Sequence, residues 1–288
     1  MEWQPGGLSS DIEDRRDDSG GGGFGFGGGG LGILGFLVLL VLSLVTGHNF
    51  LGAFFHGNGA AVQQAQPGQP QPHSAAEDRD AQLISFVNGD VQKFWRQTLT
   101  AEGIPYREAH IVLYRGETYA GCGEAEASTG PFYCPEDMKV YLDLSFWDEL
   151  RRLGGSSADF AQAFVLAHEL GHHVQNLMGT EAKVQHLMRA EPDQQNHLSV
   201  DLELQADCYG GVWAHHAQVE HILDPGDIPA ALKAVAAVGD DHLQEMSGRA
   251  VSPETWTHGS SQQRETWFER GFHTGDPAAC NTFGGSGE

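Results

Sequence analysis

The sequence predicts a mainly α-helical domain with a small β-sheet, preceded by a single transmembrane helix. Residues 31–46 form an apolar run without a charged side chain, which is typical of a membrane span. Residues 157–179 carry apolar side chains at helical spacing, and residues 198–216 are predicted to form a second helix. Only two short segments, 111–114 and 140–144, are strand candidates, so the sheet is expected to be small.

Composition narrows the choice of partner. The chain has 288 residues, 40% of them hydrophobic and 19% charged, which is typical of one globular domain with appendages. Its formal net charge is −23 and its pI is about 4.8. Phosphate binding needs clustered Lys and Arg, so this balance excludes nucleic acid as the expected partner.

The first 30 residues are dominated by glycine and by a charged run. Residues 20–30 are nearly all glycine, and residues 11–18 contain Arg15 and Arg16 among acidic side chains. Such composition offers little apolar surface to bury. We therefore expect residues 1–30 to form a disordered, Gly-rich cytoplasmic arm.

The apolar run is predicted to be a membrane anchor over residues 31–50. Sixteen helical residues cover about 24 Å of a hydrocarbon core about 30 Å thick, so the span must extend toward Phe50. A cleaved signal peptide is the alternative, but its basic region would directly precede the apolar run. Here about a dozen uncharged residues intervene. These features favour an uncleaved single span.

The orientation of this span follows from the basic residues on either side. Arg15 and Arg16 precede it, and the next basic residue is Arg79. The positive-inside rule then predicts a cytoplasmic N-terminus and an extracytoplasmic domain.

The rest of the chain divides into three parts. Residues 51–79 form a Gln/Pro-rich linker, the folded domain is expected at 80–283, and residues 284–288 form a flexible tail. Strand 140–144 is a candidate edge for an added peptide strand.

Four cysteines, all after the span, predict two disulfides in an oxidising compartment. Cys122 and Cys134 each lie beside a proposed strand and form the more economical pair. Cys208 is then left to pair with Cys280, which would tie the C-terminal segment to the core. A Cys/His zinc site is the alternative, although neither pair has C-x-x-C spacing.

The helix at 157–179 carries the sequence His168-Glu169-Leu170-Gly171-His172. Residues four apart lie on one helix face, so His168 and His172 can bind one zinc ion from the same side. Glu169 lies about 100° round the helix, where its carboxylate can reach a water molecule without ligating the metal. His173 points away from His172 and is expected to have a core or supporting role.

The helix at 198–216 carries Glu203 and Asp207 one turn apart. A catalytic zinc site needs a third protein ligand, which Glu203 can supply. Asp207 can accept the second ring N–H of a ligating histidine. Farther along, His258 and Arg264 could stabilise an oxyanion or hold a substrate, although His258 alone could be any loop histidine.

These motifs resemble those of a known family. H-E-x-x-H followed by E-x-x-A-D resembles the gluzincin metallopeptidases, and Thr257-His258 with Arg264 resembles an element of the CAAX prenyl proteases, with Gly259 in place of proline. The whole chain is similar to the bacterial membrane-anchored proteins called putative neutral zinc metallopeptidases. The resemblance implies a zincin-like α+β domain that is anchored to the bacterial cytoplasmic membrane and lies outside the cytoplasm.

The resemblance also implies a role for each residue. The zinc ligands would be His168, His172 and Glu203, with Asp207 supporting His168. Glu169 would be the general base, and His258 a transition-state donor. The expected function is a membrane-anchored endopeptidase with one Zn²⁺ per chain that acts on peptide or protein substrates. A non-catalytic zinc-stabilised interaction module and an amidase acting on cell-wall material remain alternatives.

Overall fold

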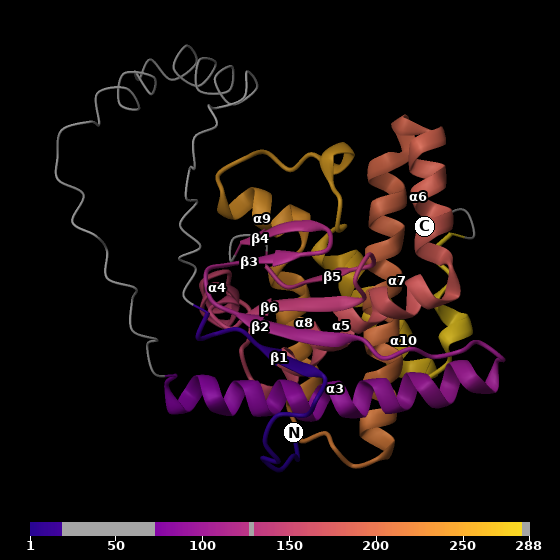
Figure 1. Cartoon of the computed structure of the whole chain (residues 1–288). Helices are drawn as coiled ribbons and strands as arrows, with labels where there is room; N and C mark the ends of the chain where they lie inside the picture. The colour runs from indigo at the N-terminus through magenta and orange to yellow at the C-terminus, as the bar shows by residue number, and fades with distance from the viewer. Residues whose placement is uncertain (19–72, 127–129, 284–288) are drawn as a thin grey trace, which may run out of the picture. The chain divides into compact units, whose positions relative to one another are not determined.

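The computed structural model describes residues 1–18, 73–126 and 130–283. Within them the chain is mainly helical, with a four-stranded mixed sheet and a two-stranded hairpin, as the sequence predicts (Figure 1). None of the helices in these residues is long and apolar enough to cross a membrane. The predicted span at 31–50, most of the predicted linker and the tail at 284–288 lie outside the described residues.

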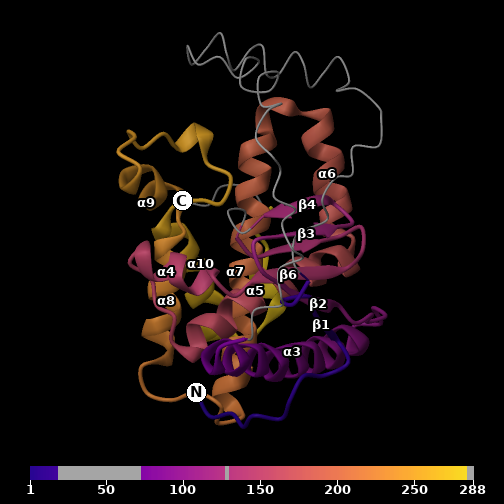
Figure 2. The same cartoon turned by 60° about the vertical axis from the view of Figure 1, so that its left-hand side comes forward.

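The main sheet has the strand order β1-β2-β6-β5 (Figure 1, Figure 2). Its strands are β1 (Ile12–Asp14), β2 (His110–Tyr114), β6 (Lys139–Asp143) and β5 (Phe132–Cys134). The three strands β1, β2 and β6 are parallel, and β5 is antiparallel to β6. The prediction that strand 140–144 forms an edge is therefore wrong. β5, too short to stand out in the sequence, takes that place.

Both faces of the sheet are covered. Ile111, Leu113, Val140 and Leu142 pack into the helical core. Their neighbours Val112, Tyr114 and Tyr141 face the other way, into a smaller cluster that includes Ala125 of the hairpin β3 (Glu117–Ala120) and β4 (Gly123–Glu126). The predicted disulfide Cys122–Cys134 is present and joins this hairpin to β5. The hairpin and the edge of the sheet are thus linked covalently.

The helices form the larger part of the domain. In chain order they are α3 (Ala75–Ala101), α4 (Phe146–Arg152), α5 (Asp159–Met178), α6 (Thr180–Ala190), α7 (Gln195–Val219), α8 (Asp227–Ala237), α9 (Asp240–Met246) and α10 (Ser261–Thr274). Gly179 ends α5 in the left-handed conformation. Ser156 and Ser157 do not cap its start, because the N-cap residue is Ala158 and the Ser157 hydroxyl accepts a hydrogen bond from Arg151.

Two glycines bring α7 and α10 into close contact. A Cβ at Gly211 would lie 2.1 Å from the Phe268 carbonyl oxygen, and one at Gly271 would lie 2.0 Å from the Cys208 carbonyl oxygen. The predicted disulfide Cys208–Cys280 is also present and fixes the chain beyond α10 to α7. The α7 backbone that carries Glu203 is therefore held tightly from the C-terminal side.

Gly211→Ala should destabilise the domain by at least about 1–3 kcal/mol, because the added methyl group forces α10 away from α7. Urea unfolding of the full chain measures this loss. Gly89→Ala is the matched control. Gly89 lies within α3, and apart from the backbone of that helix no atom lies within 4 Å of the added Cβ, so that change should be neutral or slightly stabilising. Equal stability of the two variants would contradict the close packing.

Residues 1–17, here called the N-terminal strap, belong to the folded domain. Strand β1 pairs with β2 in register Ile12↔Ile111, and Met1, Trp3 and Ile12 pack against the main core. The prediction of a disordered arm is therefore wrong for these residues, while residues 19–30 lie outside the described residues. The composition of residues 1–30 taken together, glycine run included, is too polar to predict a folded segment. The charges of the strap in fact form ion pairs with the domain.

Candidate metal centre

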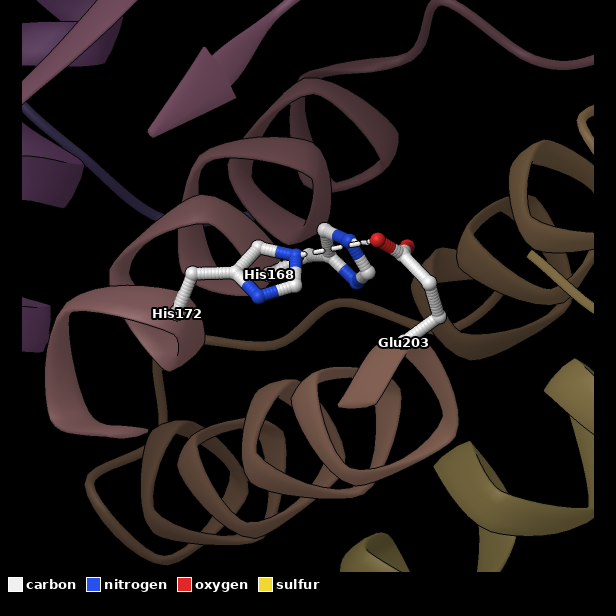
Figure 3. A group of neighbouring side chains, drawn as sticks. All are labelled: His168, His172 and Glu203. Carbon is white, nitrogen blue, oxygen red and sulfur yellow. Dashed lines mark ion pairs between the residues drawn. The ribbon is translucent and has the colours of Figure 1, made fainter. Parts of the chain in front are cut away.

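Two helices bring the three predicted ligands together. His168 and His172 lie one turn apart on α5, and Glu203 faces them from α7 (Figure 3). Its two carboxylate oxygens lie 3.3 Å from His168 Nε2 and 3.5 Å from His172 Nε2. One ligand atom from each residue lies within 4.8 Å of the others. Gly171 permits this approach, since a Cβ there would lie 3.1 Å from the Ala206 carbonyl oxygen.

The second nitrogen of each imidazole is already held by the protein. His168 Nδ1 lies 2.9 Å from Asp207 Oδ1, and His172 Nδ1 lies 2.8 Å from Gln175 Oε1. These contacts fix both tautomers with Nε2 as the free electron-pair donor. Two imidazole nitrogens and one carboxylate form the His₂Glu set typical of catalytic zinc, so the residues fit this metal.

Gln175 is a residue that sequence reasoning missed. Its side-chain oxygen faces His172, while its amide nitrogen donates to the Leu202 carbonyl at 2.8 Å. It therefore couples the second histidine to the helix that carries Glu203. Its position three residues after His172, on the same helix face, is the signal that could have found it.

The cluster is strongly coupled electrostatically. Burial lowers the pKa of His168, but the Asp207 and Glu203 carboxylates outweigh burial and raise it to about 10. Burial raises the pKa of Glu203, yet the two histidines hold it well below its usual range. Without metal, His168 therefore carries an extra proton at neutral pH, and metal binding must displace that proton.

Asp207 and Arg264 form a buried ion pair behind His168. Arg264 Nε donates to Asp207 Oδ2 at 2.7 Å, and its Nη2 donates to Oδ1 at 2.9 Å. Asp207 is fully buried and Arg264 is 4% exposed. The structure thus places Asp207 where the sequence predicts it. Two of the three guanidinium nitrogens of Arg264 donate to the Asp207 carboxylate. This differs from the contact with an oxyanion that the sequence suggests for Arg264.

Asp207→Ala should weaken zinc binding by about 10–100-fold, because His168 loses the partner that orients it. It should also lower the free energy of unfolding by about 3–5 kcal/mol, because Arg264 is left buried without a counter-charge. Chelator competition measures the first effect, and urea unfolding in excess chelator measures the second. Asp201→Ala on the same helix is the control, since the ion pair of the Asp201 carboxylate is with the exposed His197, at the long distance of 3.9 Å. Native stability of Asp207→Ala without metal would contradict this assignment.

Glu169 lines the same cavity as the three ligands. The cavity has a volume of about 1090 Å³. Its lining includes Phe132 and Tyr133 from β5, Phe146 from α4 and His258. The Glu169 side chain is 6% exposed, and burial raises the pKa of its carboxyl group. A carboxylate with a raised pKa is suited to accept and release a proton near neutral pH.

His258 lies at the cavity on the segment before α10, half exposed. Its Nδ1 lies 3.0 Å from Thr257 Oγ1 and 3.4 Å from Asp240 Oδ1, and the contact with Asp240 raises its pKa. Asp240 Oδ2 also accepts the backbone N–H groups of residues 257–259. Sequence reasoning missed Asp240, because nothing in the sequence connects it to a segment 17 residues away.

His173 has a structural role, as expected. It is fully buried, with Nδ1 3.0 Å from Tyr133 Oη and Nε2 2.7 Å from the Arg107 carbonyl oxygen. Burial lowers its pKa to about 4, so it stays neutral. It therefore connects the metal-binding helix to β5 and to the segment before β2.

Comparison with known proteins points to one family. A profile of the family described as "Putative neutral zinc metallopeptidase" matches residues 1–283. The chain is 45% identical over 288 residues to "Uncharacterized protein YpfJ" of Escherichia coli (strain K12), covering 99% of this chain and 100% of that protein. It is 42% identical over 213 residues to "Uncharacterized protein Rv2575" of Mycobacterium tuberculosis (strain ATCC 25618 / H37Rv), covering 69% of each. No solved structure matches. The chain therefore belongs to the putative neutral zinc metallopeptidase family.

Proposed function

We propose that this protein is a zinc-dependent endopeptidase that binds one zinc ion per chain through His168, His172 and Glu203. The observation that carries the proposal is the convergence of this set with Glu169 in one large cavity. Glu169 is adjacent to His168 in the chain and makes no part of the three-ligand group. A purely structural zinc site usually closes with four ligands and has no use for such a carboxylate.

The residues of the chain have separate tasks in peptide hydrolysis. Zinc at this site would supply Lewis acidity, which makes water more acidic and a carbonyl carbon more electrophilic. Glu169 accepts the proton of the attacking water and then delivers it to the leaving amine. Its buried position favours both steps, because burial raises the pKa of its carboxyl group toward neutral pH.

His258 is the proposed donor to the oxyanion of the tetrahedral intermediate. It lines the cavity, and its raised pKa favours the protonated form that donates hydrogen bonds. Asp240 and Thr257 hold its Nδ1 side. Arg264 also borders the cavity, but its bonds to Asp207 support a positioning role rather than direct contact with substrate.

The cavity and the strand beside it favour an extended peptide as substrate. Phe132 and Tyr133 of β5 line the cavity, and β5 ends the sheet on that side among the described residues. A peptide can add to such an edge through main-chain hydrogen bonds. Main-chain hydrogen bonds do not depend on the side chains of the peptide, so any preference for a substrate sequence would come from the residues of the cavity wall.

The proposed compartment is extracytoplasmic. Both disulfides lie within the domain that carries the metal centre, and paired cysteines are typical of oxidising compartments. Membrane attachment through residues 31–50 is part of the proposal and rests on the apolar sequence alone.

Cleavage of a peptide library by the purified full chain tests the proposal, with and without added zinc. The full chain is used because β1 belongs to the sheet. We expect zinc-dependent cleavage of internal peptide bonds. Cleavage restricted to amide bonds of cell-wall peptides would favour the amidase. Full zinc loading without any cleavage would contradict catalysis and favour an interaction module.

A further inference from the structure

The N-terminal strap is held to the domain by contacts along its whole length. The Met1 amine lies 3.0 Å from both Asp224 Oδ2 and Asp227 Oδ2. The Trp3 indole N–H donates to the carboxylate of Asp159, the first residue of the metal-binding helix α5, at 2.8 Å. These contacts place the first residues of the chain against the start of α8 and against the start of α5, the helix that carries His168 and His172.

The second half of the strap is bound more deeply. Glu13 lies on β1, and its carboxylate is 2.6 Å from Lys139 Nζ on β6, two strands away. Arg16 is 5% exposed, and its guanidinium lies 2.7 Å from Asp14 and 3.4 Å from Asp78 of α3. Undocking the strap would remove a strand from the sheet and separate Glu13 from Lys139 and Arg16 from Asp78, so the docked form is part of the native fold.

The strap ends where the rest of the domain begins. Asp17 Oδ1 lies 2.9 Å from His73 Nε2, and the other ring nitrogen of His73 lies 3.2 Å from Asp78. The chain therefore leaves the folded unit at Asp17 and re-enters it at the same place. Residues 1–17 and the described residues from 73 onward accordingly form one compact unit.

From this arrangement we propose that the N-terminal strap and the metal centre occupy the same side of the membrane. A chain that leaves and re-enters one folded unit crosses a bilayer an even number of times, or not at all. One crossing at residues 31–50 would place β1 and β2 on opposite sides, although they are hydrogen-bonded neighbours. Arg15 and Arg16 then do not orient a span as the sequence predicts, because Arg15 bonds Glu13 and Arg16 bonds Asp14 within the fold.

The apolar run also limits the number of crossings. Two helical crossings need about 40 apolar residues, whereas the apolar run from Leu31 to Thr46 has 16. Membrane attachment from a single side is the arrangement that satisfies both the fold and the sequence. The proposal does not depend on peptidase activity.

Labelling of single introduced thiols tests the proposal in cells that produce the full chain. All four native cysteines are in disulfides, so Ser10→Cys and Thr100→Cys each introduce one free thiol at an exposed position. Ser10 belongs to the strap and Thr100 to α3. An impermeant maleimide is added to intact cells or to lysed cells, and the labelled fractions are compared.

We expect the two positions to behave alike: both labelled in intact cells, or both only after lysis. Either result places strap and domain in one compartment, and the first places that compartment outside the cytoplasm. Labelling of one position in intact cells and of the other only after lysis would overturn the proposal.

Limited proteolysis provides a second measurement on the unmodified protein. Trypsin can cut after Arg15 and Arg16 only if the strap leaves the sheet. Cleavage at these two residues should therefore be on the order of tenfold slower in native than in unfolded protein. Asp14→Asn removes the carboxylate that pairs with Arg16 and should speed this cleavage. Equal release from native and unfolded protein would show that the strap is not docked and would overturn the proposal.

Discussion

Glu169→Gln is expected to reduce turnover by at least about 10²–10⁴-fold while zinc stays bound, because general base catalysis contributes a factor of this size. Glutamine fills nearly the same space as glutamate but cannot accept a proton from water at neutral pH. Glu169 is separate from the three-ligand group, so the substitution removes no ligand. It also removes a carboxyl group whose burial disfavours its charged form, so the free energy of unfolding should not fall.

Glu181→Gln is the matched control for this prediction. Glu181 lines the same cavity, and its carboxylate accepts a hydrogen bond from Gln185 on α6, away from the metal ligands. Turnover of a cleaved library peptide and zinc content are measured for both variants. Native turnover by Glu169→Gln would rule out the proposed peptidase mechanism. An equal loss in Glu181→Gln would point to a general effect of charge in the cavity.

The metal centre was predictable because its information is local. Helical periodicity places His168 and His172 on one face, and Glu203 and Asp207 on another, without knowledge of the tertiary fold. The chemistry of zinc then requires that the two helices meet. The disulfides were predictable for a related reason: four cysteines allow few pairings, and Cys122 and Cys134 lie close to strands.

Apart from Gln175, the parts that sequence reasoning missed depend on contacts between residues distant in sequence. Strand β1 has three residues and gains its stability from β2, about a hundred residues away, so no local pattern reveals it. The partner of Arg264 is likewise 57 residues distant, and proximity to the predicted site suggested an oxyanion role instead. Strand β5 is equally short and becomes an edge only because β6 is already paired with β2 on its other side.

Glu203→Ala should remove most of the zinc from the purified protein. Binding free energies of about 10–16 kcal/mol at structural zinc sites are shared among their ligands, so losing one of three should weaken affinity by at least about a hundredfold. The loss should exceed that of Asp207→Ala, because Glu203 lies 3.3 Å and 3.5 Å from the two ligating nitrogens, whereas Asp207 acts through His168. Glu181→Ala, in the same cavity, should keep full zinc content.

The pH dependence of zinc affinity provides an independent check on the same residue. Because Asp207 and Glu203 raise the pKa of His168 to about 10 against the lowering effect of burial, zinc must displace a proton throughout the neutral range. Affinity should therefore rise by about tenfold per pH unit between about pH 6 and 8, and fall as acid restores the proton. Without Glu203 the pKa of His168 should fall, although the Asp207 carboxylate still raises it, so this slope should begin to flatten at a lower pH than in the native protein. Chelator competition at several pH values measures both slopes. Unchanged zinc content and an unchanged slope in Glu203→Ala would remove this residue from the ligand set.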